Sequence, residues 1–186
     1  VKEWSPDGIA ALAGWQIALD RLAAAHTHLD VAVLDEPGGA VAGCVASWVE
    51  AGVATCRVID GLRRAGVQQV GLVEPYPALN VGQIIAWMER LQVAGSSPSF
   101  LHLDVDRYAI RDQNKHGVTV HPENDLPRLQ SICQAWGIPF GIIVFGQRAN
   151  TDTQYGISAR AWLHQLHRYM SGWPDRLIVQ SWERAS

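Results

Sequence analysis

Apolar and polar residues alternate over residues 101–106, within the stretch 100–106 that reads Phe-Leu-His-Leu-Asp-Val-Asp. Consecutive side chains of a β-strand point to opposite faces, so the pattern predicts a strand with two unlike faces. The apolar face carries Leu101, Leu103 and Val105, and the titratable face carries His102, Asp104 and Asp106. The two carboxylates stand at the carboxyl end of the strand, where parallel α/β folds carry their catalytic and binding residues. Acids at this position can also begin a loop or cap a helix.

Four further segments have strand-like patterns, and helical spacing of apolar residues separates them. The predicted strands are 29–36, 67–74, 100–106, 139–145 and 177–183. The predicted helices are 5–25, 43–65 with Gly52 as a possible break, 80–93, 122–136 and 152–170. Residues 107–121 are rich in polar side chains and are predicted to be a long connection.

Strands that alternate with helices of this length predict a parallel sheet with right-handed crossovers. The sequence contains neither Gly-x-Gly-x-x-Gly nor a phosphate loop, so an open doubly wound sheet is the less favoured arrangement. Each unit spans roughly 35 residues, and eight such units would need on the order of 280, near the usual barrel size. We therefore expect residues 1–186 to form one α/β domain that is part of a (β/α)8 barrel. A five-strand arc leaves two open edges, so we also expect a further segment or a partner chain to complete it.

Composition narrows the possible partners of the chain. The 186 residues carry a net charge of −3 and no basic stripe, which argues against nucleic acid. Apolar runs are interrupted well before the length of a bilayer span, so no membrane association is expected. The three cysteines have no C-x-x-C spacing, and neither a disulfide framework, a metal nor a cofactor is predicted. No signal peptide is recognised, but the sequence begins at Val1, and the compartment stays open.

Carboxylates end four of the five predicted strands, whereas the strand over 139–145 is followed by Gln147. The acids are Asp35, Glu36, Glu74, Asp104, Asp106 and Glu183. In a parallel α/β fold these ends converge, and neighbouring acids raise each other's pKa into the range useful for acid and base catalysis. Tyr76 and Trp182 stand beside them and offer flat faces to a sugar ring. Glycoside hydrolysis uses two carboxylates, so an oligo- or polysaccharide substrate is predicted.

Four short motifs at these strand ends resemble those of (β/α)8 glycoside hydrolases. They are Leu-Asp-Glu-Pro (34–37), Val-Glu-Pro-Tyr-Pro (73–77), Leu-Asp-Val-Asp (103–106) and Gln-Ser-Trp-Glu (180–183). If the last strand is the eighth of a barrel, Asp-Glu-Pro matches the Asn-Glu-Pro signature of the large retaining clan. The resemblance then implies that Glu36 is the proton donor. The chain departs from that clan because its seventh strand would end at Gly146-Gln147 without the nucleophilic acid.

These observations lead to a hypothesis for the role of each candidate residue. Glu36 is expected to be the general acid, and Asp104 or Glu74 the base or nucleophile. The predicted substrate contacts are Asp35, Tyr76, Asp106, Gln147, Trp182 and Glu183. Two other functions stay open. One is a catalytically inactive carbohydrate-binding barrel, which Gln147 favours, and the other is a metal-dependent phosphoesterase or aldolase-like barrel in which the same acids hold Mg²⁺ or Mn²⁺.

Overall fold

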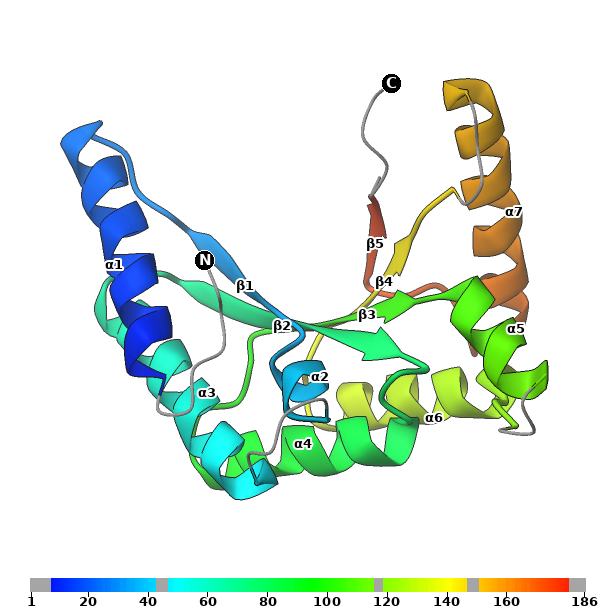
Figure 1. Ribbon diagram of the computed structural model, residues 1–186, viewed down its shortest axis with the longest axis horizontal. Coiled ribbons are helices and arrows are strands. Elements are labelled where there is room, and N and C mark those ends of the chain that lie inside the picture. The colour runs from blue at the N-terminus through cyan, green and yellow to red at the C-terminus, as the bar shows by residue number, and fades with distance from the viewer. Residues whose placement is uncertain (1–7, 43–46, 116–118, 147–150, 181–186) are drawn as a thin grey trace. The chain divides into compact units, whose positions relative to one another are not determined.

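The computed structural model describes residues 8–42, 47–115, 119–146 and 151–180 and shows helices alternating with strands (Figure 1). The strands are β1 (Val31–Asp35), β2 (Gln69–Tyr76), β3 (Leu101–Val105), β4 (Phe140–Val144) and β5 (Arg176–Val179). The helices are α1 (Ile9–Ala24), α2 (Pro37–Ala42), α3 (Trp48–Arg64), α4 (Val81–Val93), α5 (Arg107–Lys115), α6 (Pro122–Ala135) and α7 (Asp152–Tyr169).

The strands follow one another in the sheet in the order in which they occur in the chain, β1-β2-β3-β4-β5. Val31 of β1 pairs with Gln69 of β2, and Ile142 of β4 pairs with Leu177 of β5, both in parallel register. A doubly wound sheet reverses its strand order at a switch point, whereas consecutive βα units of a barrel do not. The predicted α/β fold with barrel-type parallel strands is therefore confirmed, and the doubly wound alternative is excluded.

The chain divides into two compact units, which we describe separately. The first contains residues 1–74 and 82–101, and the second contains residues 75–81 and 102–186. In the first unit, α1 and α2 contact α3, and the buried core includes Leu34, Ile59, Leu72 and Trp87. In the second unit, α6 contacts α7, and both helices contact β4, whose five residues are all buried. A strand buried on both faces is what a sheet covered by helices requires.

The helix predicted over 43–65 corresponds to α3, which begins after Ser47, whereas its first residues, 43–46, lie outside the described residues. The short helix α2 precedes this segment and was not predicted. The Ser47 hydroxyl accepts a hydrogen bond from the Glu50 amide at 3.2 Å, and the Glu50 carboxylate accepts one from the Ser47 amide at 3.1 Å. This capping box satisfies two amides that a helix start otherwise leaves without partners. Gly52 does not break α3: it is buried inside the helix, and an added Cβ would make only an ordinary contact with the Trp87 ring, at 4.0 Å.

The prediction of a connection over 107–121 is wrong in its first part, which forms α5. The Asp106 carboxylate accepts hydrogen bonds from the amides of Tyr108 and Ala109, at 2.7 and 3.1 Å, and so caps the helix. Ile110 is buried and anchors the helix to the second unit. The many polar side chains lie on a short helix with little apolar surface, and for that reason their pattern resembles that of a loop.

We expect Gly71→Ala to lower the free energy of unfolding by at least about 1–3 kcal/mol, because its Cβ would overlap the ring of Phe100 in a packed core. Gly156→Ala in α7 is the matched control, since no atom lies within 4 Å of its Cβ position. This control should raise the free energy of unfolding by about 0.5–1 kcal/mol through helix propensity. Urea unfolding measures both values, and equal effects of the two variants would contradict the packing argument.

Candidate functional site

The end of β1 holds two neighbouring acids in different environments. Asp35 is the last residue of the strand and is exposed, whereas Glu36 is half-buried. The Glu36 backbone has φ 50° and its amide donates to the Val73 carbonyl of β2 at 2.9 Å. A left-handed conformation is costly for a residue with a Cβ, by roughly 1–2 kcal/mol. The surrounding structure therefore holds the Glu36 backbone in a conformation that the chain alone would rarely adopt.

The contact that holds this turn is made by Glu74, which lies in β2 and has no exposed surface. Its Oε1 accepts a hydrogen bond from the Gly38 amide at 2.9 Å, and its Oε2 accepts one from the Gly39 amide at 3.1 Å. Both amides belong to the first turn of α2, whose N–H groups have no partner within the helix. One carboxyl group thus ties the segment after Glu36 to the neighbouring strand.

Only glycine fits at residue 38 in this arrangement. A Cβ at Gly38 would stand 2.9 Å from both carboxyl oxygens of Glu74 and 3.0 Å from the carbon between them. Such separations are shorter than the van der Waals contact of carbon with oxygen, so a larger residue would push the carboxyl group away. The glycine that follows Asp-Glu-Pro in the sequence therefore allows the Glu74 contact.

Burial raises the pKa of Glu74 to about 8. The Gly38 and Gly39 amides act in the opposite direction because they stabilise the carboxylate, and the negative charge of Glu36 raises the pKa further. Trp87 also favours the charged form of Glu74. Its indole N–H, however, forms no hydrogen bond of standard length and angle within the described residues, so we assign it a minor part. The pKa of Glu36 is itself raised, first by burial and then by the charge of Asp35.

The predicted site residues of the second unit have other contacts. Tyr76 is 1 % exposed and its hydroxyl donates to Oδ2 of Asp125 at 2.7 Å, so that burial and this hydrogen bond raise the pKa of the phenol. Asp106 caps α5, as described above, while Asp104 is half-buried in β3. His102 is buried, and burial together with the charge of Arg176 lowers its pKa to about 4. An imidazole with this pKa is neutral at pH 7.

The remaining predicted contacts, Gln147, Trp182 and Glu183, lie outside the described residues. Within one unit, the structure brings together Asp35, Glu36 and Glu74, and in the other it places Tyr76, Asp104 and Asp106. Sequence patterns did not reveal the role of the Gly38 and Gly39 amides. The only signal was the Gly-Gly pair directly after Asp-Glu-Pro, which is equally typical of a simple turn.

A pocket of about 680 Å³ in the second unit was also missed. It lies between α5, α7 and the segment 119–123, and we call it the arginine pocket after Arg107 and Arg111 in its lining. One of its walls is α5, a segment that the sequence predicts to be a connection. Trp162 of α7 reaches the carboxyl end of β3, where its indole N–H donates to the Val105 carbonyl at 3.1 Å.

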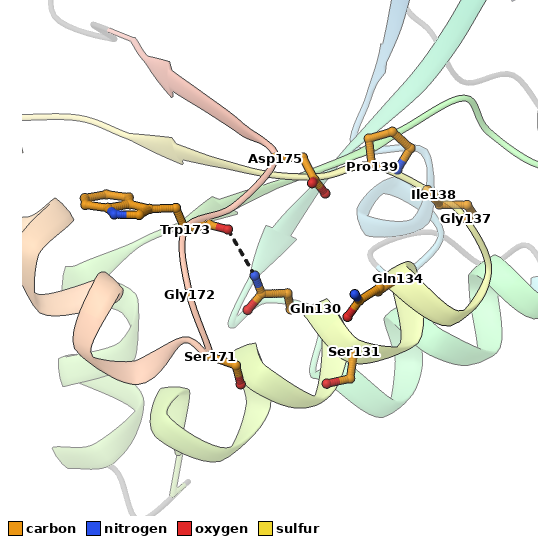
Figure 2. A pocket seen from close by; sticks show the side chains of 10 residues that line it. All are labelled: Gln130, Ser131, Gln134, Gly137, Ile138, Pro139, Ser171, Gly172, Trp173 and Asp175. Atoms are coloured by element: carbon orange, nitrogen blue, oxygen red, sulfur yellow. Dashed lines mark hydrogen bonds between the residues drawn. The ribbon is translucent and has the colours of Figure 1, made fainter.

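A second pocket, of about 470 Å³, lies beside the start of β5 and is lined by residues of α6 and of the turn before β5 (Figure 2). The Gln130 amide donates to the Trp173 carbonyl at 3.3 Å (Figure 2). Asp175 accepts a hydrogen bond from the Phe140 amide at 2.8 Å. The Trp173 ring stacks on His167 with 4.0 Å between ring centres. These contacts hold the turn before β5 in place, at the amino end of the strands.

Neither a metal cluster nor a membrane span is found in the part of the chain that the structure describes. There, no group of three or more His, Cys, Asp or Glu side chains could hold a metal ion. Among the same residues, no helix is long and apolar enough to cross a bilayer. Two of the cysteines, Cys56 and Cys133, are buried thiols, and burial raises the pKa of Cys133 to about 12.

Comparison of the sequence with known proteins finds no matching family model and no matching curated protein.

The raised pKa of Glu74 predicts a pH-dependent stability. Its pKa is about 8 in the folded chain and near 4.5 in the unfolded chain, so the folded state binds one more proton between these values. The free energy of unfolding of the wild type, relative to that of Glu74→Gln, should therefore fall as pH rises from about 4.5 to about 8. The slope is at most about 1.4 kcal/mol per pH unit.

Urea unfolding across this pH range measures the difference. Glu89→Gln is the matched control, because it removes a carboxylate from an exposed position of α4 without touching the Gly38 and Gly39 amides. A difference between wild type and Glu74→Gln that stays constant from pH 4.5 to 8 would contradict the assignment.

Proposed function

We propose that the protein is a carbohydrate-active hydrolase that cleaves glycosidic bonds by carboxylate acid and base catalysis at the carboxyl ends of its parallel strands. The observation that carries this proposal is the state of Glu36 at the end of β1. It is half-buried, constrained to a left-handed backbone conformation, and has a raised pKa. A raised pKa and a constrained backbone are both features that favour a general acid, and they support this role for Glu36.

In this proposal, Glu36 donates its proton to the oxygen of the leaving sugar as the glycosidic bond breaks. Glu74 acts as a positioning residue, because it is fully buried and both its oxygens already accept amide hydrogen bonds. Through the Gly38 and Gly39 amides it fixes the start of α2, and its closeness to Glu36 couples their protonation. Asp35 raises the pKa of Glu36 and, being exposed, is also available to bind a sugar hydroxyl.

The sequence offers Asp104 or Glu74 as the second carboxylate, of which Glu74 lies in the same unit as Glu36 and Asp104 lies in the other. Asp104 is half-buried at the carboxyl end of β3, which leaves part of its surface accessible. Glu74 would first have to leave its two amides in order to reach a substrate. Asp104→Ala and Glu74→Ala distinguish them. In a retaining enzyme, added azide enters the space left by the missing nucleophile and restores turnover to that variant by forming the glycosyl azide.

Carbohydrate binding without turnover is the second candidate function. Glu74 is buried and both its oxygens already accept amide hydrogen bonds. At the paired ends of β1 and β2, Asp35 and Glu36 are therefore the acids that keep exposed surface, which favours binding. A binding protein needs such groups only to accept hydrogen bonds from sugar hydroxyls, and it needs no pair of carboxylates at catalytic spacing.

Glu36→Gln should lower kcat by about 10²–10⁴-fold, because the amide cannot donate the proton, while saccharide affinity changes little. Release of reducing sugar from a panel of oligosaccharides measures turnover, because a sugar leaving group needs the proton, and calorimetry with the same oligosaccharides measures binding. Glu89→Gln controls for the loss of one exposed carboxylate. A wild-type chain that binds saccharides but cleaves none of them would favour the binding function instead.

Asp35→Asn should move the alkaline limb of the kcat/KM profile to lower pH. Activity depends on protonated Glu36 and is lost as pH rises through its pKa, and the Asp35 charge raises that pKa. Asp30→Asn, before the start of β1, removes one negative charge at the other end of the strand and should leave the limb in place. A limb that moves equally in both variants would count against Glu36 as the titrating acid.

A further inference from the structure

The arginine pocket is built by two helices of the second unit whose facing residues recur at helical spacing. From α5 come Arg107, Arg111 and Asn114, and from α7 come Trp162, Gln165 and Tyr169. Residues that are three, four or seven positions apart share one face of a helix, so each set forms one wall. The segment 119–123 closes a third side, and the Val120 amide donates to the Asn114 side-chain oxygen at 2.7 Å. The volume of about 680 Å³ is within the range of small-molecule sites.

Both guanidinium groups of the pocket lie over aromatic rings. The Arg107 Cζ is 5.6 Å from the centre of the Trp162 ring, and the Arg111 Cζ is 5.2 Å from the centre of the Tyr108 ring. Trp162 is itself 3 % exposed and held by its hydrogen bond to the Val105 carbonyl. A ring beneath a guanidinium restricts its motion without using its N–H donors, which stay available to a ligand.

The charges that line the pocket are unbalanced in favour of an anion. Glu123 is its only carboxylate among the described residues, and its oxygen lies 3.0 Å from Nδ1 of His121. Neither arginine forms an ion pair with a described carboxylate, and Asp106, which immediately precedes α5, is turned to the helix amides. The site therefore offers two fixed positive charges to whatever enters it.

The neutral polar groups of the pocket indicate which groups the ligand carries in addition to its negative charge. The Gln165 amide donates to the Tyr169 hydroxyl at 2.8 Å, and the same wall thus presents an amide oxygen and a phenolic oxygen next to each other. Asn114 and Thr119 add an amide and a hydroxyl on the other side. A compact inorganic anion would contact the arginines alone. A polyhydroxylated ring that carries one carboxylate can contact the arginines and, with its hydroxyls, the amide and hydroxyl groups as well.

We propose that the arginine pocket binds a uronic-acid residue, so that the saccharide recognised by this protein is an acidic one. The carboxylate of the sugar lies against Arg107 and Arg111, whose planar forks match its geometry. The ring hydroxyls reach the amide and hydroxyl groups of α7 and of Asn114. This substrate class rests on the proposed carbohydrate function, which it makes more specific.

Calorimetry with the full chain tests the proposal, using a galacturonic acid trisaccharide and the neutral galactose trisaccharide with the same linkages. The acidic trisaccharide should bind at least about tenfold more tightly, since a charge-assisted hydrogen bond contributes that much or more. Arg107→Gln and Arg111→Gln should each weaken its binding about tenfold or more. Arg111→Lys should recover only part of the loss, because a lysine keeps the charge but not the fork.

Arg160→Gln is the matched control, because this arginine is exposed on α7 and does not line the pocket. It should leave the affinity unchanged, and circular dichroism should show that all variants fold. Equal affinity for the two trisaccharides, or binding that survives both arginine variants, would overturn the proposal. The same holds if inorganic phosphate binds at the arginines and the acidic trisaccharide does not, since the pocket would then be a simple anion site.

These experiments distinguish a failure of the hydrolase proposal from a failure of the pocket assignment. If the acidic trisaccharide binds through the arginines but no glycoside is cleaved, the hydrolase proposal fails and the assignment of the pocket stands. If Glu36-dependent cleavage of neutral glycosides is observed without binding of the acidic trisaccharide, the assignment of the pocket fails and the hydrolase proposal stands.

Discussion

The paired hydrogen bonds from the Gly38 and Gly39 amides to the buried Glu74 carboxyl group set the geometry of the first candidate site. A carboxyl group removed from water is costly unless its oxygens find donors, and the first turn of a helix is where donors without partners occur. The contact therefore satisfies two needs at once. It stabilises the buried acid and it holds the segment that follows Glu36 against the neighbouring strand.

Other local features depend on this contact. Residue 38 has to be glycine, because a Cβ would occupy the space next to the carboxyl oxygens. Glu36, two residues earlier, adopts a left-handed conformation that a free chain would avoid. Burial then raises the pKa of both glutamates, and the charge of Asp35 adds to the shift of Glu36 as the charge of Glu36 adds to that of Glu74. Strain, burial and like charge concentrated at one strand end are typical of functional sites.

The second unit uses its acids differently from the first. Asp106 caps α5, and Asp125 accepts the hydrogen bond of Tyr76, so two carboxylates there have structural partners. Its positive charges face a pocket instead, with arginines held over rings. In each unit, one buried side chain is held by a group from another element: Glu74 by the amides of α2, and Tyr76 by Asp125 of α6.

The sequence by itself determined the parallel α/β fold, because period-2 and helical patterns are local properties of the chain. It also placed Asp35, Glu36 and Asp104 near the ends of strands, since polar residues and turn formers mark those ends, but it ended β2 at Glu74, whereas the strand continues through Pro75 to Tyr76. It did not reveal α5, whose polar surface resembles a loop, nor the amide contacts of Glu74, whose partners are 36 and 35 residues away. Burial, pKa and the shape of a pocket depend on which segments meet in space, and only the tertiary structure decides that.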